Sequence, residues 1–370
     1  MTGTDFEVEI KTRDEDRYVF HSGHGVENPR KVLEEEIKLL KNLHVETTSA
    51  VLVVDSRIGI EGTVIGDRAR NGRVMMTSSK ARETLLSELN RRRNQPEAST
   101  EVMLTSDIAE DSLRKYNTAV YIPRTGDPLH LVKQKILEAS KTLRDGGRVV
   151  IASSRRTVER LKEYAGELGS FDETIDGDVS ILEIEPDDNS VEEPFEVSKL
   201  KHSIKGEKVK FQVPSGMFTP EDMRRVEMMV RELSAAQGKL LDVAVGPGLA
   251  AIYSRGLYEQ ETVSVSQDDY MKRFAEKSAS INGKDLEAYV DEGLHIFDSR
   301  SFDSIAYNAK GRDRRFRQNM KDCFRVLRPS GTVFVVHSKD IPAEQVLRQE
   351  FSSYSVRRRE GNLQITSATK

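Results

Sequence analysis

The chain has 370 residues, of which 37% are hydrophobic and 32% are charged, and its formal net charge is -4. This length allows two domains of ordinary size, each with a core of its own. The single cysteine, Cys323, excludes a disulfide framework and a thiolate metal cluster, and the seven histidines lack the spacing of a zinc motif. There is no secretory leader and no apolar run near the roughly 20 residues that span a bilayer. The sequence therefore predicts a cytoplasmic protein without a bound metal.

The first half of the chain, residues 1–185, is predicted to alternate strands and helices. The entry segment 20–29 (FHSGHGVENP) leads into an amphipathic helix over residues 31–43, and an apolar strand with a glycine turn follows at residues 50–62 (AVLVVDSRIGIEG). Residues 140–154 indicate the end of a helix, a glycine turn and a further strand. This order is typical of a mainly parallel, doubly wound sheet.

Residues 186–210 interrupt this pattern with two prolines and a change from acidic to basic charge, which predicts a partly extended linker. The alternation then resumes over residues 211–370. Strands are expected near residues 239–245, 261–266, 286–291, 302–308, 331–337 and as a last pair within 353–368, and helices near residues 220–236, 268–281, 312–327 and 342–350.

The two halves repeat each other along the sequence. The entry segment 20–29 matches residues 211–220 (FQVPSGMFTP) at its Phe, Gly and Pro with one constant offset. The glycine turns align as well, with Asp55 opposite Asp242 and Gly59 opposite Gly246. We therefore predict two tandem copies of one doubly wound, Rossmann-like domain of the class I methyltransferase type.

The carboxyl ends of the strands in the second half carry the groups that an S-adenosylmethionine site needs. A glycine turn after the first strand brings backbone close to the cofactor, and polar side chains after the second and third strands meet the ribose and the adenine. The residues predicted to bind the cofactor are Asp242, Ala244, Gly246, Gly248, Ser266, Gln267, Asp291 and Glu292.

The fourth strand of the second half ends in FDSIAYN, which places Tyr307 and Asn308 where a methyl acceptor would be held. Methylation of an exocyclic amine requires its nitrogen to be turned toward the sulfonium methyl group, and an Asn carbonyl beside a stacked aromatic ring supplies that orientation. We predict Asn308 and Tyr307 as catalytic residues. The other interpretation is that Asn308 ends the strand and caps the next helix.

Three basic blocks, residues 91–93, 310–317 and 357–359, stand out in this slightly acidic chain. Each block by itself is typical of a solvated helix end or strand edge, but the middle one follows the predicted acceptor site and could neutralise phosphates. The residues predicted to bind RNA are Lys310, Arg312, Arg314, Arg315 and Arg317.

The duplicated organisation, the entry FQVPSGMF, the D-x-x-x-G-x-G loop, the acidic end of the third strand and FDSIAYN together resemble the tandem-domain ribosomal RNA guanine-N2 methyltransferases of the small-domain type. The resemblance covers nearly the whole chain. It implies that the C-terminal domain binds S-adenosylmethionine and methylates a guanine amine in ribosomal RNA, as a monomer that acts on the RNA or on a ribosomal subunit. It also implies a degenerate N-terminal domain that has lost cofactor binding and assists with RNA binding and folding.

Several residues differ from the pattern of that family. In its first loop, Ala244 stands at the position of a glycine, and Ser266 stands where an acid usually follows the second strand. Its acceptor motif N-P-P-F/Y is here Asn308 followed by Ala, Lys and Gly, so that Tyr307 or Phe316 would have to supply the aromatic ring.

Two alternatives to an RNA methyltransferase stay open from the sequence. One is a binding protein, in which the methyltransferase fold has lost its chemistry and serves RNA binding or ribosome assembly. The other is an enzyme that methylates a small molecule or a protein. Retention of Asn308 and the two loop glycines favours an enzyme, and the basic run after Asn308 favours RNA.

Overall fold

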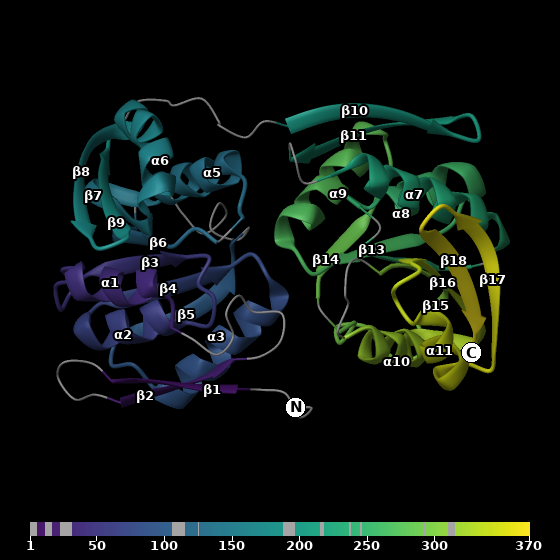
Figure 1. Ribbon diagram of the computed structural model, residues 1–370, viewed down its shortest axis with the longest axis horizontal. Coiled ribbons are helices and arrows are strands. Elements are labelled where there is room, and N and C mark those ends of the chain that lie inside the picture. Colours follow the sequence, from purple (N-terminus) through teal and green to yellow (C-terminus); the bar gives the residue numbers. More distant parts are fainter. Residues whose placement is uncertain are drawn as a thin grey trace. The chain divides into compact units, whose positions relative to one another are not determined.

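The computed structural model divides into two compact units, Met1–Phe195 and Glu196–Lys370 (Figure 1). The structure describes residues 6–11, 17–22, 32–105, 115–124, 126–187, 197–214, 218–236, 238–244, 246–291, 293–309 and 315–370. Each unit is described here by itself.

In the described part of unit 1, a hairpin is followed by alternating strands and helices. These elements are β1 (Phe6–Lys11), β2 (Arg17–Ser22), α1 (Glu34–Asn42), β3 (Ala50–Val54), α2 (Ile60–Arg68), β4 (Arg73–Ser78), α3 (Ala81–Asn94), β5 (Ser99–Leu104), β6 (Tyr116–Tyr121), α5 (Leu129–Ser140), β7 (Leu143–Ser154), α6 (Arg155–Leu168), β8 (Gly169–Asp176) and β9 (Val179–Pro186).

Unit 2 repeats this order. Its described elements are β10 (Val197–Ile204), β11 (Glu207–Pro214), α7 (Pro220–Glu232), the 3-10 turn η2 (Leu233–Ala235), β12 (Leu240–Val243), α8 (Leu249–Tyr258), β13 (Thr262–Ser266), α9 (Asp269–Ile281), β14 (Glu287–Val290), β15 (Phe302–Asn308), α10 (Phe316–Val326), β16 (Leu327–Ser338), α11 (Ala343–Glu350), β17 (Ser353–Glu360) and β18 (Leu363–Thr369).

Each unit is built around a mixed sheet of seven described strands with the same connectivity. The order is β5-β4-β3-β6-β7-β9-β8 in unit 1 and β14-β13-β12-β15-β16-β18-β17 in unit 2. The first five strands in each order run parallel, and the last two join antiparallel. The predicted fold class, two tandem doubly wound domains, is confirmed.

Helices cover both faces of the unit 2 sheet because its central strands are apolar on both sides. Leu240 and Ala306 pack on one face with α7, α8 and α9, whereas Leu241 and Ile305 pack on the other with α10 and α11. Alternation along a strand sends successive side chains to opposite faces, so each central strand contributes to both cores. The parallel strands end at one edge of the sheet, where the loops after β12, β13, β14 and β15 meet.

The predicted linker region contains ordered structure. Residues 197–204 form β10 and pair with β11 in a hairpin whose apolar residues, such as Ile204 and Val209, belong to the core of unit 2. Folded structure of unit 2 therefore begins before residue 211. The helix before β16 also ends at Val326, because the strand starts at Leu327 instead of near residue 331.

The hairpins of the two units are held by the same backbone contacts. In unit 1, Asn94 on α3 accepts a hydrogen bond from the backbone N–H of Val19 and donates one to its carbonyl, both at 3.1 Å. In unit 2, Asn282 after α9 does the same with Lys210, at 3.0 Å and 2.5 Å. The repetition seen in the sequence thus extends to individual side-chain contacts.

Candidate functional site

The loop between β12 and α8 is built from residues in the left-handed backbone region. Ala244, Gly246 and Gly248 have φ values of 57°, 69° and 68°. Glycine adopts this region at little cost, whereas a Cβ is disfavoured there. A Cβ at Gly248 would also lie 2.8 Å from that of Ala275, and one at Gly246 would lie 2.8 Å from the ring of Phe218. The loop therefore depends on small residues.

Strand pairing corrects the alignment of this loop with its counterpart in unit 1. Val54 pairs with Tyr121 as Val243 pairs with Tyr307. The next residues, Asp55 and Ala244, both have positive φ, at 58° and 57°. Gly59 and Gly248 are then the N-caps of α2 and α8. Asp55 therefore corresponds to Ala244 and not to Asp242, and Gly59 corresponds to Gly248 and not to Gly246. The same count places Arg57 at the position of Gly246.

Asp242 is fully buried, and its carboxylate accepts a hydrogen bond of 3.0 Å from the backbone N–H of Ala251 in the first turn of α8. A negative charge at this place also stabilises the positive end of the helix. Asp242 therefore fixes the start of α8 behind the loop. No side chain caps that helix at Gly248.

The residues predicted after β13 and β14 lie side by side. The backbone N–H of Asp291 donates a 2.9 Å hydrogen bond to the carbonyl of Ser266, whose hydroxyl accepts one from Asp268 N–H at 3.1 Å. The Asp291 carboxylate accepts bonds from the backbone of its own loop, at Gly293 and Ile296. Ser266 and Asp291 are partly buried, Gln267 is exposed, and Glu292 lies outside the described residues.

Asn308, at the end of β15, is tied to the glycine loop. Its Nδ2 donates a 3.1 Å hydrogen bond to the carbonyl of Ala244, and its Oδ1 accepts one of 3.3 Å from Arg225 on α7. These partners fix the orientation of the amide, because a carbonyl cannot donate and a guanidinium cannot accept. Arg225 is buried and also donates to the carbonyl of Ala309 at 3.0 Å. The amide oxygen keeps a second lone pair.

The sequence did not single out Arg225. It lies on the buried face of an amphipathic helix among apolar residues, and a cation at such a position needs partners. That placement is the signal which could have identified it.

Tyr307 points away from this edge, into the core. Its ring belongs to the apolar cluster beneath α10 and packs edge-on against Phe316, and its hydroxyl accepts a 2.6 Å hydrogen bond from Asn319. Tyr307 and Phe316 are both at most 5% exposed. Neither ring is therefore placed to stack on a base, which corrects that expectation. The partly exposed aromatic residue beside the loop is Phe218, against Gly246.

The basic blocks are only partly available to a partner. In the first block, Arg91 and Arg92 both pair with Glu88. In the third, Arg358 pairs with Glu232. Of the residues predicted to bind RNA, Lys310, Arg312 and Arg314 lie outside the described residues, Arg315 is partly buried, and Arg317 is exposed and donates to Gln349 at 2.6 Å.

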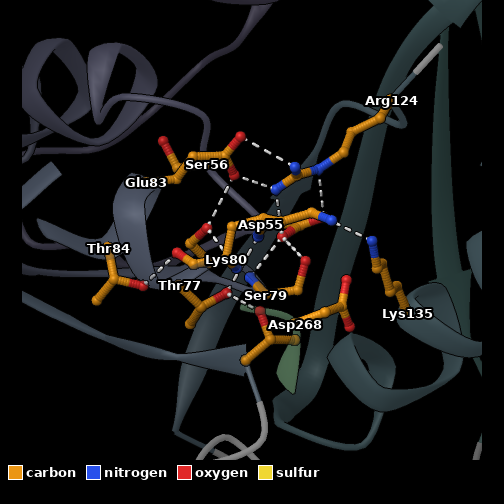
Figure 2. A network of polar contacts seen from close by, with 12 residues as sticks. Asp55, Ser56, Thr77, Ser79, Lys80, Glu83, Thr84, Arg124, Lys135 and Asp268 are labelled. Carbon is orange, nitrogen blue, oxygen red and sulfur yellow. Dashed lines mark hydrogen bonds and ion pairs between the residues drawn. The ribbon is translucent and has the colours of Figure 1, made fainter. Parts of the chain in front are cut away.

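The corresponding edge of unit 1 is filled by buried charges (Figure 2). Asp55 accepts two hydrogen bonds from Arg124, at 3.0 Å and 2.9 Å, and one from Lys135 at 2.5 Å. Ser79 also donates to Asp55, from its backbone N–H and from its hydroxyl, and Arg124 donates to Glu83 as well. The cations hold the pKa of Asp55 well below its ordinary value despite its burial. Burial raises the pKa of Glu83 to about 7, against the pull of Arg124.

A second buried group lies on the same loop. Arg57 forms a two-pronged pair with Glu36, with both contacts at 3.0 Å, and Ser56 donates to Glu61 at 2.9 Å. Burial raises the pKa of Glu36 to about 8, and it also raises that of Glu61. We call the seven residues of both groups the ion network: Glu36, Asp55, Arg57, Glu61, Glu83, Arg124 and Lys135.

The described ranges hold neither a metal-binding cluster nor a membrane-spanning helix. No group of three or more His, Cys, Asp or Glu side chains there is arranged to hold a metal ion. Among the helices of the same ranges, none has both the length and the apolar composition needed to cross a membrane.

Comparison with known proteins places unit 2 in a family. Residues 208–367 match the family described as "Methyltransferase small domain", so unit 2 carries a methyltransferase small domain. Curated protein sequences give no match.

Among solved structures, the chain is similar to the 16S rRNA N2 G1207 methyltransferase (RsmC) of T. thermophilus in complex with AdoMet and guanosine, at 17% identity and a TM-score of 0.72. That similarity covers 99% of this chain and 98% of the other, so the tandem fold is shared from end to end. M. jannaschii TYW2 in complex with AdoMet is matched at 11% identity and a TM-score of 0.37, over 46% of this chain and 85% of that one.

Proposed function

We propose that this chain is an S-adenosylmethionine-dependent methyltransferase that acts on the exocyclic N2 amine of a guanine in ribosomal RNA. Unit 2, residues 211–370 with the preceding hairpin, would bind the cofactor, and unit 1 would not. The observation that carries the proposal is the contrast at one loop, where unit 2 has Ala244 and Gly246 and unit 1 has Asp55 and Arg57 at the corresponding positions.

The residues at the carboxyl edge of the unit 2 sheet fit the cofactor. Gly246 and Gly248 let the loop adopt positive φ values, and the first turn of α8 follows, where a helix N-terminus supplies backbone N–H groups besides that of Ala251, which Asp242 already binds. Ser266 and Asp291 bring polar groups to the neighbouring strand ends. When bound, S-adenosylmethionine would supply a methyl group activated on a sulfonium.

Asn308 is proposed to position the acceptor amine. Arg225 and the Ala244 carbonyl hold its amide in one orientation, and the free lone pair on Oδ1 can accept an N–H of the guanine amine. Pre-set geometry of this kind lowers the barrier because the reacting nitrogen is already aimed. Arg225 acts as a positioning residue. Phe218 is the aromatic side chain proposed to contact the ligands of this edge.

Calorimetric titration with S-adenosylmethionine tests the cofactor assignment. Binding is expected for the native chain and should be lost in Gly246→Arg, which installs the Arg57 of unit 1. Because a Cβ at Gly246 would press on Phe218, Ala244→Asp serves as a second variant, since Asp tolerates a positive φ. It should also lose binding while its melting temperature stays close to native. Native protein that binds no cofactor at millimolar concentration would rule out the enzyme.

Methyl transfer to unmethylated ribosomal RNA, supplied as free RNA and as assembled subunits, tests the acceptor site. Asn308→Ala should lower the transfer rate about 100-fold, as expected for a lost positioning contact. Arg225→Gln should lower it less, and the exposed neighbour on the same helix, Arg224→Gln, should leave it unchanged. Full activity of Asn308→Ala would remove this residue from the acceptor site.

The second candidate is an RNA-binding or ribosome-assembly factor without chemistry. The burial of Tyr307 and Phe316 favours it, because it leaves the acceptor side without the two expected rings. Binding of RNA by a chain that does not bind S-adenosylmethionine would decide for it.

A further inference from the structure

The hairpin β10–β11 of unit 2 presents a row of lysines on its outer face. Residues that pair across the hairpin share a face, and the outer pairs are Lys199 with Gln212, Lys201 with Lys210, and Ser203 with Lys208. Of the residues between them, Ile204, Val209 and Phe211 enter the core, whereas Leu200 is exposed. Lys199, Lys201, Lys208 and Lys210 are all exposed.

These four lysines, the lysine face, have no carboxylate partner among the described residues. Lys201 and Lys210 stand directly opposite each other. Like charges at directly opposed positions destabilise a pair of strands, so the arrangement costs folding free energy unless an anion covers it. The hairpin is anchored by its inner face and by the backbone contacts of Lys210 with Asn282, neither of which needs this outer charge.

The hairpin of unit 1 shows which of these charges the fold requires. It makes the same anchoring contacts, and these align Glu7 with Lys199, Glu9 with Lys201, and Val19 with Lys210. Glu7 is further neutralised by Arg93 at 2.8 Å. The same hairpin therefore folds with glutamates at the positions of Lys199 and Lys201 and with Val19 at that of Lys210, so these three lysines are not required by the fold. Arg17 stands at the position of Lys208.

The lysine face borders a groove. The groove has a volume of about 600 Å³, and its lining includes Lys201, Lys208, Lys210 and, from the end of α9, the exposed Ile281. Ile281 corresponds to Arg93 of unit 1, whose guanidinium donates a hydrogen bond to Glu7. The groove therefore combines three lysines with one exposed apolar side chain, and a cationic groove can follow a nucleic-acid backbone.

The hairpin also leads toward the cofactor loop. Strand β11 ends at Pro214, four residues before Phe218, whose ring packs edge-on against Phe211 at 5.7 Å and lies against Gly246. Alternate residues of a strand share a face and lie about 7 Å apart. Lys208 and Lys210 therefore form a row along β11 that runs toward Phe218 and the loop after β12. A chain of phosphates bound along β11 is thereby guided toward the site.

We propose that the lysine face and its groove bind the phosphate backbone of single-stranded RNA and guide the strand to the methyltransferase site of unit 2. The inference rests on the proposed function for its choice of RNA, but the surface itself is distinct from residues 310–317.

The test measures the affinity of the full chain for a fluorescently labelled single-stranded RNA of mixed sequence over a range of salt concentrations. In the quadruple variant Lys199→Gln, Lys201→Gln, Lys208→Gln, Lys210→Gln, the slope of log K against log salt should become shallower by about 3, since each phosphate contact to a single strand contributes about 0.7. A matched variant replaces four exposed cations elsewhere on unit 2 by Gln: Lys277, Arg300, Lys339 and Arg348. It should keep the native slope.

A second variant, Lys199→Glu with Lys201→Glu, is the control for misfolding. It introduces the glutamates that the hairpin of unit 1 carries at the corresponding positions. It should lose RNA affinity about tenfold or more at low salt while its melting temperature is kept. Three results would each overturn the proposal. The quadruple variant could keep the native salt slope, the matched variant could lose as much of the slope as the quadruple variant, or poly-glutamate could bind the lysine face as tightly as RNA. S-adenosylmethionine titration of the same variants should be native, so failure of cofactor binding and failure of the lysine face are read separately.

Discussion

The same sheet edge carries small residues in unit 2 and buried charged residues in unit 1, although the two units share their strand order and their hairpin anchors. In unit 2 the loop after the central strand carries Ala244 and Gly246. In unit 1 the corresponding Asp55 and Arg57 begin the ion network. Charged groups at a buried sheet edge must satisfy one another, because an unpaired buried charge costs folding free energy, and Asp55, Arg124 and Lys135 do so in unit 1.

The largest effect is expected when one buried cation of unit 1, Lys135, is removed. Lys135 is 1% exposed and binds Asp55 at 2.5 Å and Asp127 at 3.3 Å. Lys135→Met should lower the free energy of unfolding of unit 1 by about 3–5 kcal/mol, because it removes one of the two cations that bind the buried Asp55 carboxylate. Hydrogen exchange followed by mass spectrometry would report the loss in peptides of unit 1, with peptides of unit 2 unchanged.

Two controls sharpen that measurement. Lys141→Met, exposed at the end of the same helix, should change stability little. Asn319 occupies the corresponding place on α10 and donates to Tyr307, so Asn319→Leu should cost only about 1 kcal/mol, the value of a neutral hydrogen bond. Equal losses at Lys135 and Asn319 would contradict the view that charge closes the edge of unit 1.

A smaller effect is expected from pH. Three carboxyl groups of the ion network have a pKa that burial raises: Glu36 to about 8, Glu83 to about 7, and Glu61. A carboxyl whose pKa is raised in the folded state binds a proton that the unfolded chain releases above its ordinary value of 4.5. Its stabilisation is complete below that value and is lost as the pH rises toward about 8, the pKa of Glu36.

Stability of unit 1 should therefore fall between about pH 5 and 8, by at most about 1.4 kcal/mol per pH unit for each proton. Calorimetric unfolding across this range measures it. Glu61→Gln removes one titrating group and should flatten the decline, whereas the exposed Glu167→Gln should not. Stability that rises over the same range in the native chain would contradict the assignment.

The alternating elements of unit 2 could be predicted because apolar residues recur with the period of a strand or a helix, as at residues 302–308 and 343–350. The same period of two shows why Tyr307 could not join Asn308 at the site, since neighbouring residues of a strand face opposite sides. The sequence predicts a linker up to residue 210 because the lysines of this region mask the inward alternation of Ile204 and Val209.

The loop alignment failed for a different reason. Matching Asp55 to Asp242 pairs two identical letters, but the strand partners of Val54 and Val243 set the true correspondence two residues away. Side-chain partners such as Arg225 with Asn308 are distant in sequence and depend on packing of α7 against the sheet, which no local pattern encodes.

The smallest test concerns Ala244 itself. Its φ of 57° is costly for a residue with a Cβ, so Ala244→Gly relieves strain but adds freedom to the unfolded chain. The net result should be a gain in the stability of unit 2 of about 0.5 kcal/mol with cofactor affinity kept. Ala250→Gly in α8 is the matched control and should lose about 1 kcal/mol, because its backbone is helical. Both can be measured by calorimetric unfolding. If Ala244→Gly destabilised unit 2, the Ala244 side chain would be making contacts that outweigh its backbone strain, and the loop of unit 2 would be filled rather than open.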